Sequence, residues 1–238
     1  MVVDGGSTDG TADIARARQV RVVTSPRTGL YASLNAGFST VKGDWLTWIN
    51  ADDLLYASAL PDRLRDARDT DVMYGAVDFI DADGRFVHSW LSAAPRDLLR
   101  LYKAGYSPLL QQGTLFHRRV FEGLDGFDEA MLFVGDADFW WRALEHGVRL
   151  TRQAYPPVAA FRLHPGQLSQ RHANAMRLEH DAMVKRHGGR SRPLSAWLSL
   201  LRFRGANLSR YAVRCMRRRD LDGRLRMSRG YDIPGSSR

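Results

Sequence analysis

The sequence predicts an α/β domain with a mostly parallel central sheet flanked by helices. Apolar, β-branched runs alternate with helix-like segments over residues 1–68, which favours strand–helix–strand units. Loops rich in Gly, Ser, Thr and Asp follow these runs, as expected where a strand ends and a helix begins. The run from Trp45 to Ile49 is the clearest strand, because it is dense in aromatic and β-branched residues.

The other elements follow from the same two patterns. Further strands are expected where short apolar runs occur, at residues 1–4, 20–24, 72–79, 86–90, 112–116 and 159–163. The run 86–90 follows a turn at 81–84 and is expected to return as a hairpin. Helices are expected where apolar residues recur at helical spacing, at residues 30–41, 58–68, 98–102, 136–146 and 174–186, with shorter pieces after Thr11 and His117.

The chain's positive charge is confined to its C-terminal part. The 238 residues have a formal charge of +9, but residues 190–238 hold 13 Arg and 3 Asp with no Lys or Glu, a charge of +10. Residues 1–189 are therefore close to neutral, which argues against a nucleic-acid-binding body. We expect two parts: a domain over residues 1–189 and a basic extension over residues 190–238.

Cysteine content and hydropathy bound the location. The single Cys215 allows no internal disulfide, which fits a reducing compartment. The opening residues lack the basic flank and apolar stretch of a secretory signal, and no apolar run approaches the ~20 residues that span a bilayer. A cytoplasmic protein is expected.

Oxygen-bearing side chains gather directly after the strand at 45–49. Asn50, Asp52 and Asp53 lie within four positions, and two adjacent carboxylates repel one another unless a partner compensates. A hard divalent cation is a natural partner, and ligands gather at the carboxyl ends of strands in open α/β sheets. The alternative is a polar turn, in which Asp and Asn are common.

Four separated blocks, together with a closing motif, resemble the family 2 glycosyltransferases, which have the GT-A fold. In order along the chain the blocks and the motif are VVDGGSTDGT at 2–11, GLYASLNAG at 29–37, GD followed by NADD at 43–53, GFDE with GDADFWWR at 126–142, and FRLHPG with Ser169 at 161–169. The resemblance covers roughly residues 1–189 and implies a GT-A-like, nucleotide-sugar-binding domain.

The resemblance implies a donor site and a metal. Asp4 would bind the base of the nucleotide, and further residues would line the nucleotide pocket: Ser7, Gly29, Asn35 and Asn50. The alternative for Asp4 is a turn at the end of a strand. The alternatives for Asn35 and Gly29 are helix packing and a turn.

For the metal, Mn²⁺ or Mg²⁺, the resemblance points to two carboxylates and a histidine. Asp53 would hold the ion on the donor's diphosphate, and Asp52 would share the ion or contact the ribose. His164 would be a further ligand, or only a loop residue. Asn50 stands where other members have Asp.

Asp136 matches the family's catalytic base. An inverting transfer needs one carboxylate that takes the proton of the acceptor hydroxyl, and a helix N-terminus favours the ionised form. The alternative is that Asp136 caps the helix. Asp138 competes for the same task, but Arg142, four residues on, is expected to be its ion-pair partner.

Further side chains of the fourth block are expected to contact the donor sugar or the acceptor. They are Asp128, Glu129, Asp138, Trp140 and Trp141. Because the two tryptophans are adjacent, we expect one to face the core and the other the cleft, where it could stack on a sugar.

The chain departs from the family at its beginning. The strand and helix that normally precede the Asp4 block are absent, so the resemblance implies an N-terminally truncated domain with an unprotected sheet edge.

The C-terminal extension combines apolar and basic residues. Leu194, Trp197, Leu198, Leu201 and Phe203 occur with Arg202 and Arg204, as in an interfacial segment that binds anionic lipid. The alternative is a packing helix followed by a solvated basic end. Nucleic acid is not an expected partner, because aromatic residues are not interleaved with the basic run after Tyr211.

Together these patterns predict an inverting, metal-dependent transferase that moves a sugar from a nucleotide diphosphate donor, a UDP-sugar, to a saccharide or lipid-linked acceptor in cell-surface polysaccharide synthesis. It would be cytoplasmic and peripheral at the inner face of the membrane. Two alternatives remain: a truncated, inactive homologue that binds membrane or protein, and a sugar-1-phosphate nucleotidyltransferase, although the latter's Gly-rich phosphate loop is not visible.

Overall fold

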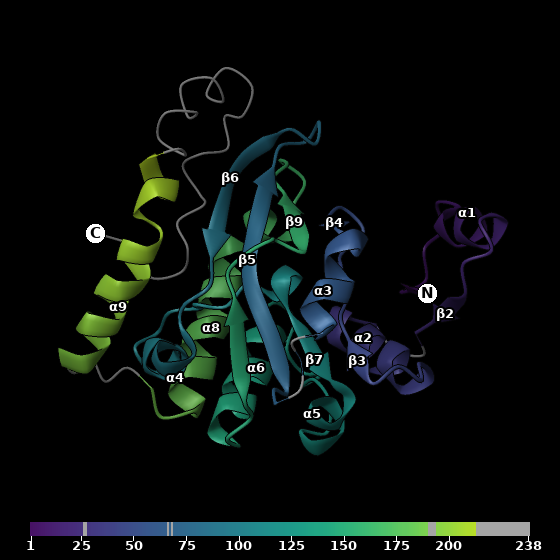
Figure 1. Cartoon of the computed structure of the whole chain (residues 1–238). Coiled ribbons are helices and arrows are strands. Elements are labelled where there is room, and N and C mark those ends of the chain that lie inside the picture. The colour runs from purple at the N-terminus through teal and green to yellow at the C-terminus, as the bar shows by residue number, and fades with distance from the viewer. Residues whose placement is uncertain (26–27, 66, 68, 190–193, 213–238) are drawn as a thin grey trace.

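The structure, a computed structural model, describes residues 1–25, 28–65, 67, 69–189 and 194–212 (Figure 1). Strands and helices alternate as expected and build a mixed α/β fold. The strands are β1 (Val2–Asp4), β2 (Val22–Thr24), β3 (Trp45–Leu46), β4 (Leu54–Leu55), β5 (Val72–Ile80), β6 (Phe86–Leu91), β7 (Leu115–His117), β8 (Leu150–Gln153) and β9 (Ala159–Arg162). The helices are α1 (Thr11–Ala17), α2 (Leu30–Thr40), α3 (Leu60–Arg65), α4 (Pro95–Lys103), α5 (Arg118–Gly123), α6 (Gly135–Glu145), α7 (Leu168–Arg171), α8 (Ala173–Arg186) and α9 (Leu194–Ala206), with 3₁₀ turns η1 (Ala57–Ala59) and η2 (Gln111–Gly113).

The larger sheet is mixed rather than mostly parallel. Among the described residues, β3–β7, β7–β5, β5–β6 and β9–β4 pair antiparallel, whereas β5–β8 and β5–β9 pair parallel. The expected hairpin is present as β5 and β6. The long β5 holds this sheet together, because it pairs with β7 and β8 through its first half and with β6 and β9 through its second half.

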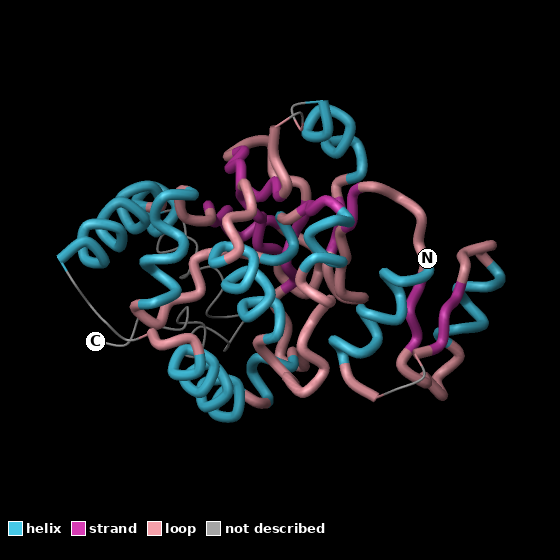
Figure 2. The backbone as a smooth tube through the Cα atoms, turned by 90° about the horizontal axis from the view of Figure 1, so that it is seen from below, coloured by secondary structure: helices cyan, strands magenta, loops and turns pink. Residues whose placement is uncertain are grey.

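A second, smaller sheet lies apart from the first. β1 and β2 pair in parallel with Val2 opposite Val22, and both lie with α1 at the end of the molecule away from α9 (Figures 1 and 2). α2 joins the two sheets. Its Gly37 approaches β1 so closely that an added Cβ would lie 2.5 Å from a methyl carbon of Val3, while Tyr31 and Phe38 of the same helix belong to the main core.

Several strand boundaries differ from the sequence expectation. The strand expected over 45–49 pairs only at Trp45 and Leu46. Beyond Leu46, hydrogen bonds that involve side chains take the place of backbone pairing between strands. The Thr47 hydroxyl donates to the Thr114 carbonyl, and the Gln111 side-chain amide donates to the Trp48 carbonyl. The first part of the run 112–116 is correspondingly the 3₁₀ turn η2. β4 and β8 were not predicted, since neither is an apolar run of useful length.

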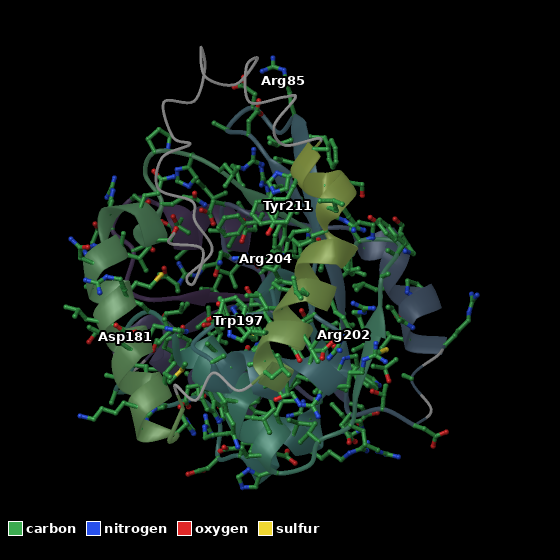
Figure 3. The ribbon with its side chains drawn as sticks, turned by 90° about the vertical axis from the view of Figure 1, so that its left-hand side faces the viewer. Arg85, Asp181, Trp197, Arg202, Arg204 and Tyr211 are labelled. Carbon is green, nitrogen blue, oxygen red and sulfur yellow. The ribbon has the colours of Figure 1, made fainter. Side chains whose placement is uncertain are left out.

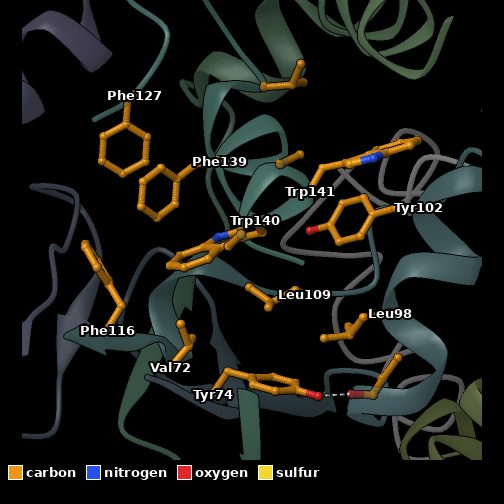
Figure 4. Packing of buried hydrophobic residues seen from close by; sticks show 14 of the residues in the cluster. Val72, Tyr74, Leu98, Tyr102, Leu109, Phe116, Phe127, Phe139, Trp140 and Trp141 are labelled. Carbon is orange, nitrogen blue, oxygen red and sulfur yellow. Dashed lines mark hydrogen bonds between the residues drawn. The ribbon is translucent and has the colours of Figure 1, made fainter. Parts of the chain in front are cut away.

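α6 lies at the centre of the hydrophobic core. Phe139 stacks on Phe127 with 4.4 Å between ring centroids, and Trp140 meets Phe116 of β7 edge-to-face at 5.5 Å (Figure 4). On its other side Trp141 lies 5.7 Å from Tyr102 of α4. Buried aromatic contacts of this kind fix the position of the helix.

α9 is part of the same body. Leu200 and Phe203 belong to the main core, and Phe203 meets Trp90 of β6 edge-to-face at 5.7 Å. The buried Asn207 accepts from the Leu91 N–H and donates to the Leu91 carbonyl, both at 2.9 Å. The boundary expected at residue 190 falls in residues 190–193, which lie outside the described ones. No described helix is long and apolar enough to cross a membrane.

We predict that Asn207→Ala loosens the attachment of α9. The change leaves the N–H and carbonyl of Leu91 without partners, and such a loss costs about 1–3 kcal/mol. Urea denaturation followed by circular dichroism measures the lost free energy of unfolding. Ser209→Ala, at an exposed position two residues further on, is the control. Equal stability of both variants would contradict the prediction.

Candidate active site

The turn that follows β3 is anchored by the carboxylate of Asp53. This residue is 7% exposed, and its Oδ1 accepts from the Arg162 N–H of β9 at 2.8 Å. Its Oδ2 accepts from the side-chain amides of Gln112 at 3.1 Å and Asn50 at 3.2 Å. Burial raises the pKa of Asp53, while these three donors act in the opposite direction. The donors tie the turn before β4 to η2 and β9.

The adjacent Asp52 has a different environment. Its side chain is 39% exposed, and its Oδ2 lies 2.9 Å from Nε2 of His164, 112 residues further along the chain. Arg162 stabilises the backbone at this position, because its Nε donates to the Asp52 carbonyl at 2.7 Å. The structure therefore brings Asp52 and His164 together with side chains open to solvent, whereas both Asp53 oxygens are bound by protein donors.

Asp52 and His164 fit a divalent cation as part of its ligand set. Carboxylate oxygen and imidazole nitrogen both suit Mn²⁺, and Mg²⁺ is commonly held by one or two carboxylates together with phosphate oxygens of a substrate. No cluster of three His, Cys, Asp or Glu side chains that could hold an ion occurs within the described ranges. The remaining ligands would thus have to come from a bound diphosphate or water.

Asp136 lies in the first turn of α6 and is half-buried. The Tyr31 hydroxyl of α2 donates to its Oδ1 at 3.3 Å. Burial raises the pKa of Asp136, and the Tyr31 hydrogen bond and the N–H of Ala137 counteract this in part. The helix N-terminus favours the charged carboxylate, whereas burial makes this carboxylate more basic than that of an exposed aspartate.

The backbone before Asp136 is held from two directions. Glu179 of α8 accepts from the N–H groups of residues 132, 133 and 134 at 2.7, 2.7 and 2.9 Å. Gly135 lies against the ring of Tyr31, and an added Cβ there would come within 2.7 Å of the ring. Glu179 therefore fixes the start of α6, and Gly135 lets Tyr31 reach Asp136.

Aromatic packing links this acid to the turn after β3. Trp48 lies two residues before Asn50 and stacks on Trp140 of α6, with 6.5 Å between ring centroids and 13° between planes. Trp140 follows Asp136 by four residues, one helical turn. The predicted metal-binding turn and the predicted base are thus connected through the packing of Trp48 on Trp140.

Asp4 and Ser7 contact each other at the end of β1. The Ser7 hydroxyl and N–H both donate to the Asp4 carboxylate, which is 7% exposed, and the hydroxyl bond is the main cause of the lowered pKa of Asp4. This is the geometry of a strand-end turn, the alternative that the sequence left open. It keeps the carboxylate ionised, as a role in reading a base would also require.

Asn35 and Gly29 have structural tasks in α2. The Asn35 side chain accepts from the Phe127 N–H and donates to the Phe127 carbonyl, each at 2.9 Å, and donates to Glu129 at 3.0 Å. Gly29 precedes the first residue of α2 with φ 113°, in the region that favours glycine. These observations agree with the alternatives that the sequence left open, helix packing for Asn35 and a turn for Gly29.

An open groove of about 1180 Å³ lies beside α6, and it is lined by three of the predicted sugar-contact residues, Asp128, Glu129 and Asp138. Asp138 is 1% exposed, and its carboxylate is bound by Arg142 at 2.8 Å, Arg186 at 2.7 Å and His187 at 2.9 Å. Burial acts to raise the pKa of Asp138, but these partners, His187 most among them, lower it below its ordinary value. The expected Asp138–Arg142 ion pair is confirmed, and Asp138 acts in the protein's own ion-pair network rather than toward a sugar.

The expectation for the two tryptophans is wrong. Trp140 is 1% and Trp141 0% exposed, so neither faces a cleft (Figure 4). The reason is that α6 is covered on both sides: the sheet and Trp48 cover Trp140, while α4 and the end of α8 cover Trp141, which stacks on His187 at 4.8 Å.

Sequence reasoning missed the residues that hold this site together. Tyr31, Gln112, Arg162 and Glu179 lie in separate segments, and none stands at a spacing that marks a contact with Asp136 or Asp53. The one signal in the sequence was membership of the resembling blocks. It applied to Tyr31 and Arg162 but not to Gln112 or Glu179.

Comparison with known proteins identifies the class. Residues 1–124, more than half of the chain, match the family model described as glycosyl transferase family 2. The chain therefore belongs to glycosyl transferase family 2.

Among curated proteins it is similar to a PGL/p-HBAD biosynthesis glycosyltransferase of Mycobacterium tuberculosis, with 27% identity over 171 residues that cover 68% of this chain and 64% of that protein. The chain thus spans less than two thirds of this relative's length.

Solved structures show the same fold. The mannosyltransferase PcManGT from Pyrobaculum calidifontis, in complex with GDP-Man and Mn²⁺, superposes with a TM-score of 0.57 at 18% identity, covering 94% of this chain and 65% of that one. TarS 1-349 of S. aureus, in complex with UDP-GlcNAc, gives 0.57 at 15% identity, covering 95% and 66%. The GT-A fold expected from the sequence is confirmed.

We predict that Tyr31→Phe raises the pKa of Asp136. The hydroxyl of Tyr31 stabilises the charged carboxylate, so its loss leaves the desolvation caused by burial less opposed. A carboxyl ¹³C NMR titration measures the shift. Tyr102→Phe is the matched control, because the buried Tyr102 hydroxyl has no hydrogen-bond partner among the described residues. A lowered or unchanged pKa in Tyr31→Phe would contradict this assignment.

Proposed function

We propose that this chain is an inverting glycosyltransferase that moves a sugar from a nucleotide diphosphate donor, a UDP-sugar, to a saccharide or lipid-linked acceptor. The observation that carries the proposal is the contact of Asp52 with His164 across 112 residues. Two residues that the family resemblance implies as metal ligands, in distant blocks of the chain, lie within hydrogen-bonding distance. PcManGT, which shares the fold, was solved with a nucleotide sugar and Mn²⁺.

Within this proposal Asp52 and His164 hold a divalent cation, Mn²⁺ or Mg²⁺. When bound, the cation would neutralise negative charge on the departing diphosphate. Asp53 keeps the turn in place from its buried position, so the structure supports Asp52 over Asp53 as the direct ligand. Asn50, which donates to Asp53, is then part of the same anchor.

Asp136 is the proposed general base. Its carboxylate takes the proton of the acceptor hydroxyl as that oxygen attacks the anomeric carbon of the donor sugar, and a single base matches an inverting displacement. Burial raises the pKa of Asp136, which makes its carboxylate a stronger base than that of an exposed aspartate. Tyr31 and Glu179 orient it.

Asp4 and Ser7 are the proposed contacts to the nucleotide, and Asp128 and Glu129 the proposed contacts to the acceptor through the groove beside α6. A lipid-linked acceptor in cell-surface polysaccharide assembly would place the enzyme in the cytoplasm, at the inner face of a membrane. The similar mycobacterial protein is named as a PGL/p-HBAD biosynthesis glycosyltransferase, which supports a biosynthetic role.

We predict that Asp52→Asn weakens Mn²⁺-dependent binding of uridine diphosphate by more than about ten-fold, because it removes a charged ligand. Isothermal titration with and without Mn²⁺ measures this. Asp83→Asn, an exposed aspartate on the β5–β6 turn, is the matched control and keeps wild-type binding. Wild-type chain without metal-dependent binding would favour the inactive homologue, and unchanged binding by Asp52→Asn would remove Asp52 from the metal site.

We predict that Asp136→Asn abolishes sugar transfer, leaves uridine diphosphate binding intact and raises thermal stability at neutral pH. The raised pKa means that the folded state disfavours the charged carboxylate, so ionisation destabilises the wild-type protein above that pKa. Melting temperatures measured at neutral and acidic pH test the sign: the gain should vanish once the wild-type carboxyl is protonated. Retained transfer would refute the base assignment, and a gain that persists in acid would refute the electrostatic explanation.

A further inference from the structure

α9 is apolar on two opposite faces. Its inner face packs into the core through Ala196, Leu200 and Phe203. Four large apolar side chains of α9 face the other way, and Leu208 follows just after the helix ends at Ala206. We call these five residues the outer stripe: Leu194, Trp197, Leu198, Leu201 and Leu208, exposed by 76%, 52%, 48%, 63% and 69%. Their spacing of three, four, seven and fourteen residues from Leu194 places them along one side of the helix.

Tertiary contacts hold α9 so that the outer stripe cannot turn inward. Arg202 and Ser199 both bind the buried carboxylate of Asp97 on α4, with 2.7 Å between the Ser199 hydroxyl and Asp97. Further along, Asn207 binds the backbone of Leu91. Figure 3 shows α9 lying on the surface of the molecule with Trp197 and Arg204 along its length. A row of exposed large apolar side chains is the kind of surface that marks an interaction site, so the outer stripe is a candidate docking surface.

The charge of the surrounding sequence indicates the kind of partner. Residues 190–219 contain nine arginines and no acidic residue, and of these arginines Arg202 is paired with Asp97. Arg204 lies on α9 and is exposed, whereas Arg210 is partly buried and its guanidinium contacts Tyr155. Leucine and tryptophan on one side with arginine at the flanks is the composition of a helix that lies in a membrane interface and is attracted by anionic headgroups.

We propose that the outer stripe of α9 docks on an anionic lipid surface, with the helix lying in the plane of the interface. A second copy of this chain fits less well, because pairing two stripes face to face would bring the exposed Arg204 of each copy together, and α9 has no acidic residue to neutralise them. The inference goes beyond the proposed transferase activity, since it rests on α9 and its charge alone.

Flotation of the full chain with phosphatidylcholine vesicles, with and without phosphatidylglycerol, tests the proposal. We expect binding only to the anionic vesicles. The double variant Leu201→Ser with Leu208→Ser should partition at least about ten-fold less, because each buried leucine contributes more than one ten-fold step. The matched control is Leu168→Ser with Leu178→Ser, which removes two exposed leucines from α7 and α8.

Circular dichroism confirms that both double variants are folded. Loss of flotation in the α9 variant alone supports the proposal. Equal flotation of both variants, or no flotation of the wild-type chain, overturns it. Sedimentation velocity provides the remaining outcome: a wild-type dimer that becomes monomeric only in the α9 variant would make the outer stripe a contact between copies and would also overturn the proposal.

Discussion

The buried carboxylate of Asp53 is the constraint on which the candidate site depends. A charge at 7% exposure is tolerated only when donors surround it, and here those donors come from the turn itself, from η2 and from β9. Because all of these donors bind the Asp53 carboxylate, the turn, η2 and β9 are held in fixed positions relative to one another. Asp52, the next residue along the backbone, is thereby turned outward to His164.

Two adjacent acids consequently have different tasks. The Asp53 carboxylate is bound by protein donors instead of water and stabilises the turn, whereas Asp52 has an exposed carboxylate and a histidine partner. A similar division occurs in α6, where Asp138 is buried among Arg142, Arg186 and His187 while Asp136 meets only one side-chain donor, Tyr31, among the described residues. In each pair the carboxylate with several protein donors stabilises the local backbone, and the carboxylate with a single side-chain partner is the proposed functional group.

The packing of α6 connects these two pairs. Trp140 and Trp141 fill opposite sides of the helix, so the aromatic residues that sequence reasoning assigned to a sugar instead fix the orientation of Asp136. α9 completes the core on the far side through Leu200 and Phe203 and leaves a second apolar surface outside. The candidate active site and the proposed membrane-binding surface thus share one hydrophobic core.

The sequence by itself determined the α/β class, the family and the positions of most helices, because helical periodicity and ordered motif blocks are local properties of the chain. It also placed Asp52, Asp136 and His164 among the candidates. Only the tertiary structure decided which acid of each pair is buried, that both tryptophans are internal, and that the larger sheet is mixed. Those outcomes depend on donors and rings from segments up to about a hundred residues away, such as Arg162 beside Asp53 and Arg186 beside Asp138. Burial of a charge is decided by such distant partners, and no local pattern encodes them.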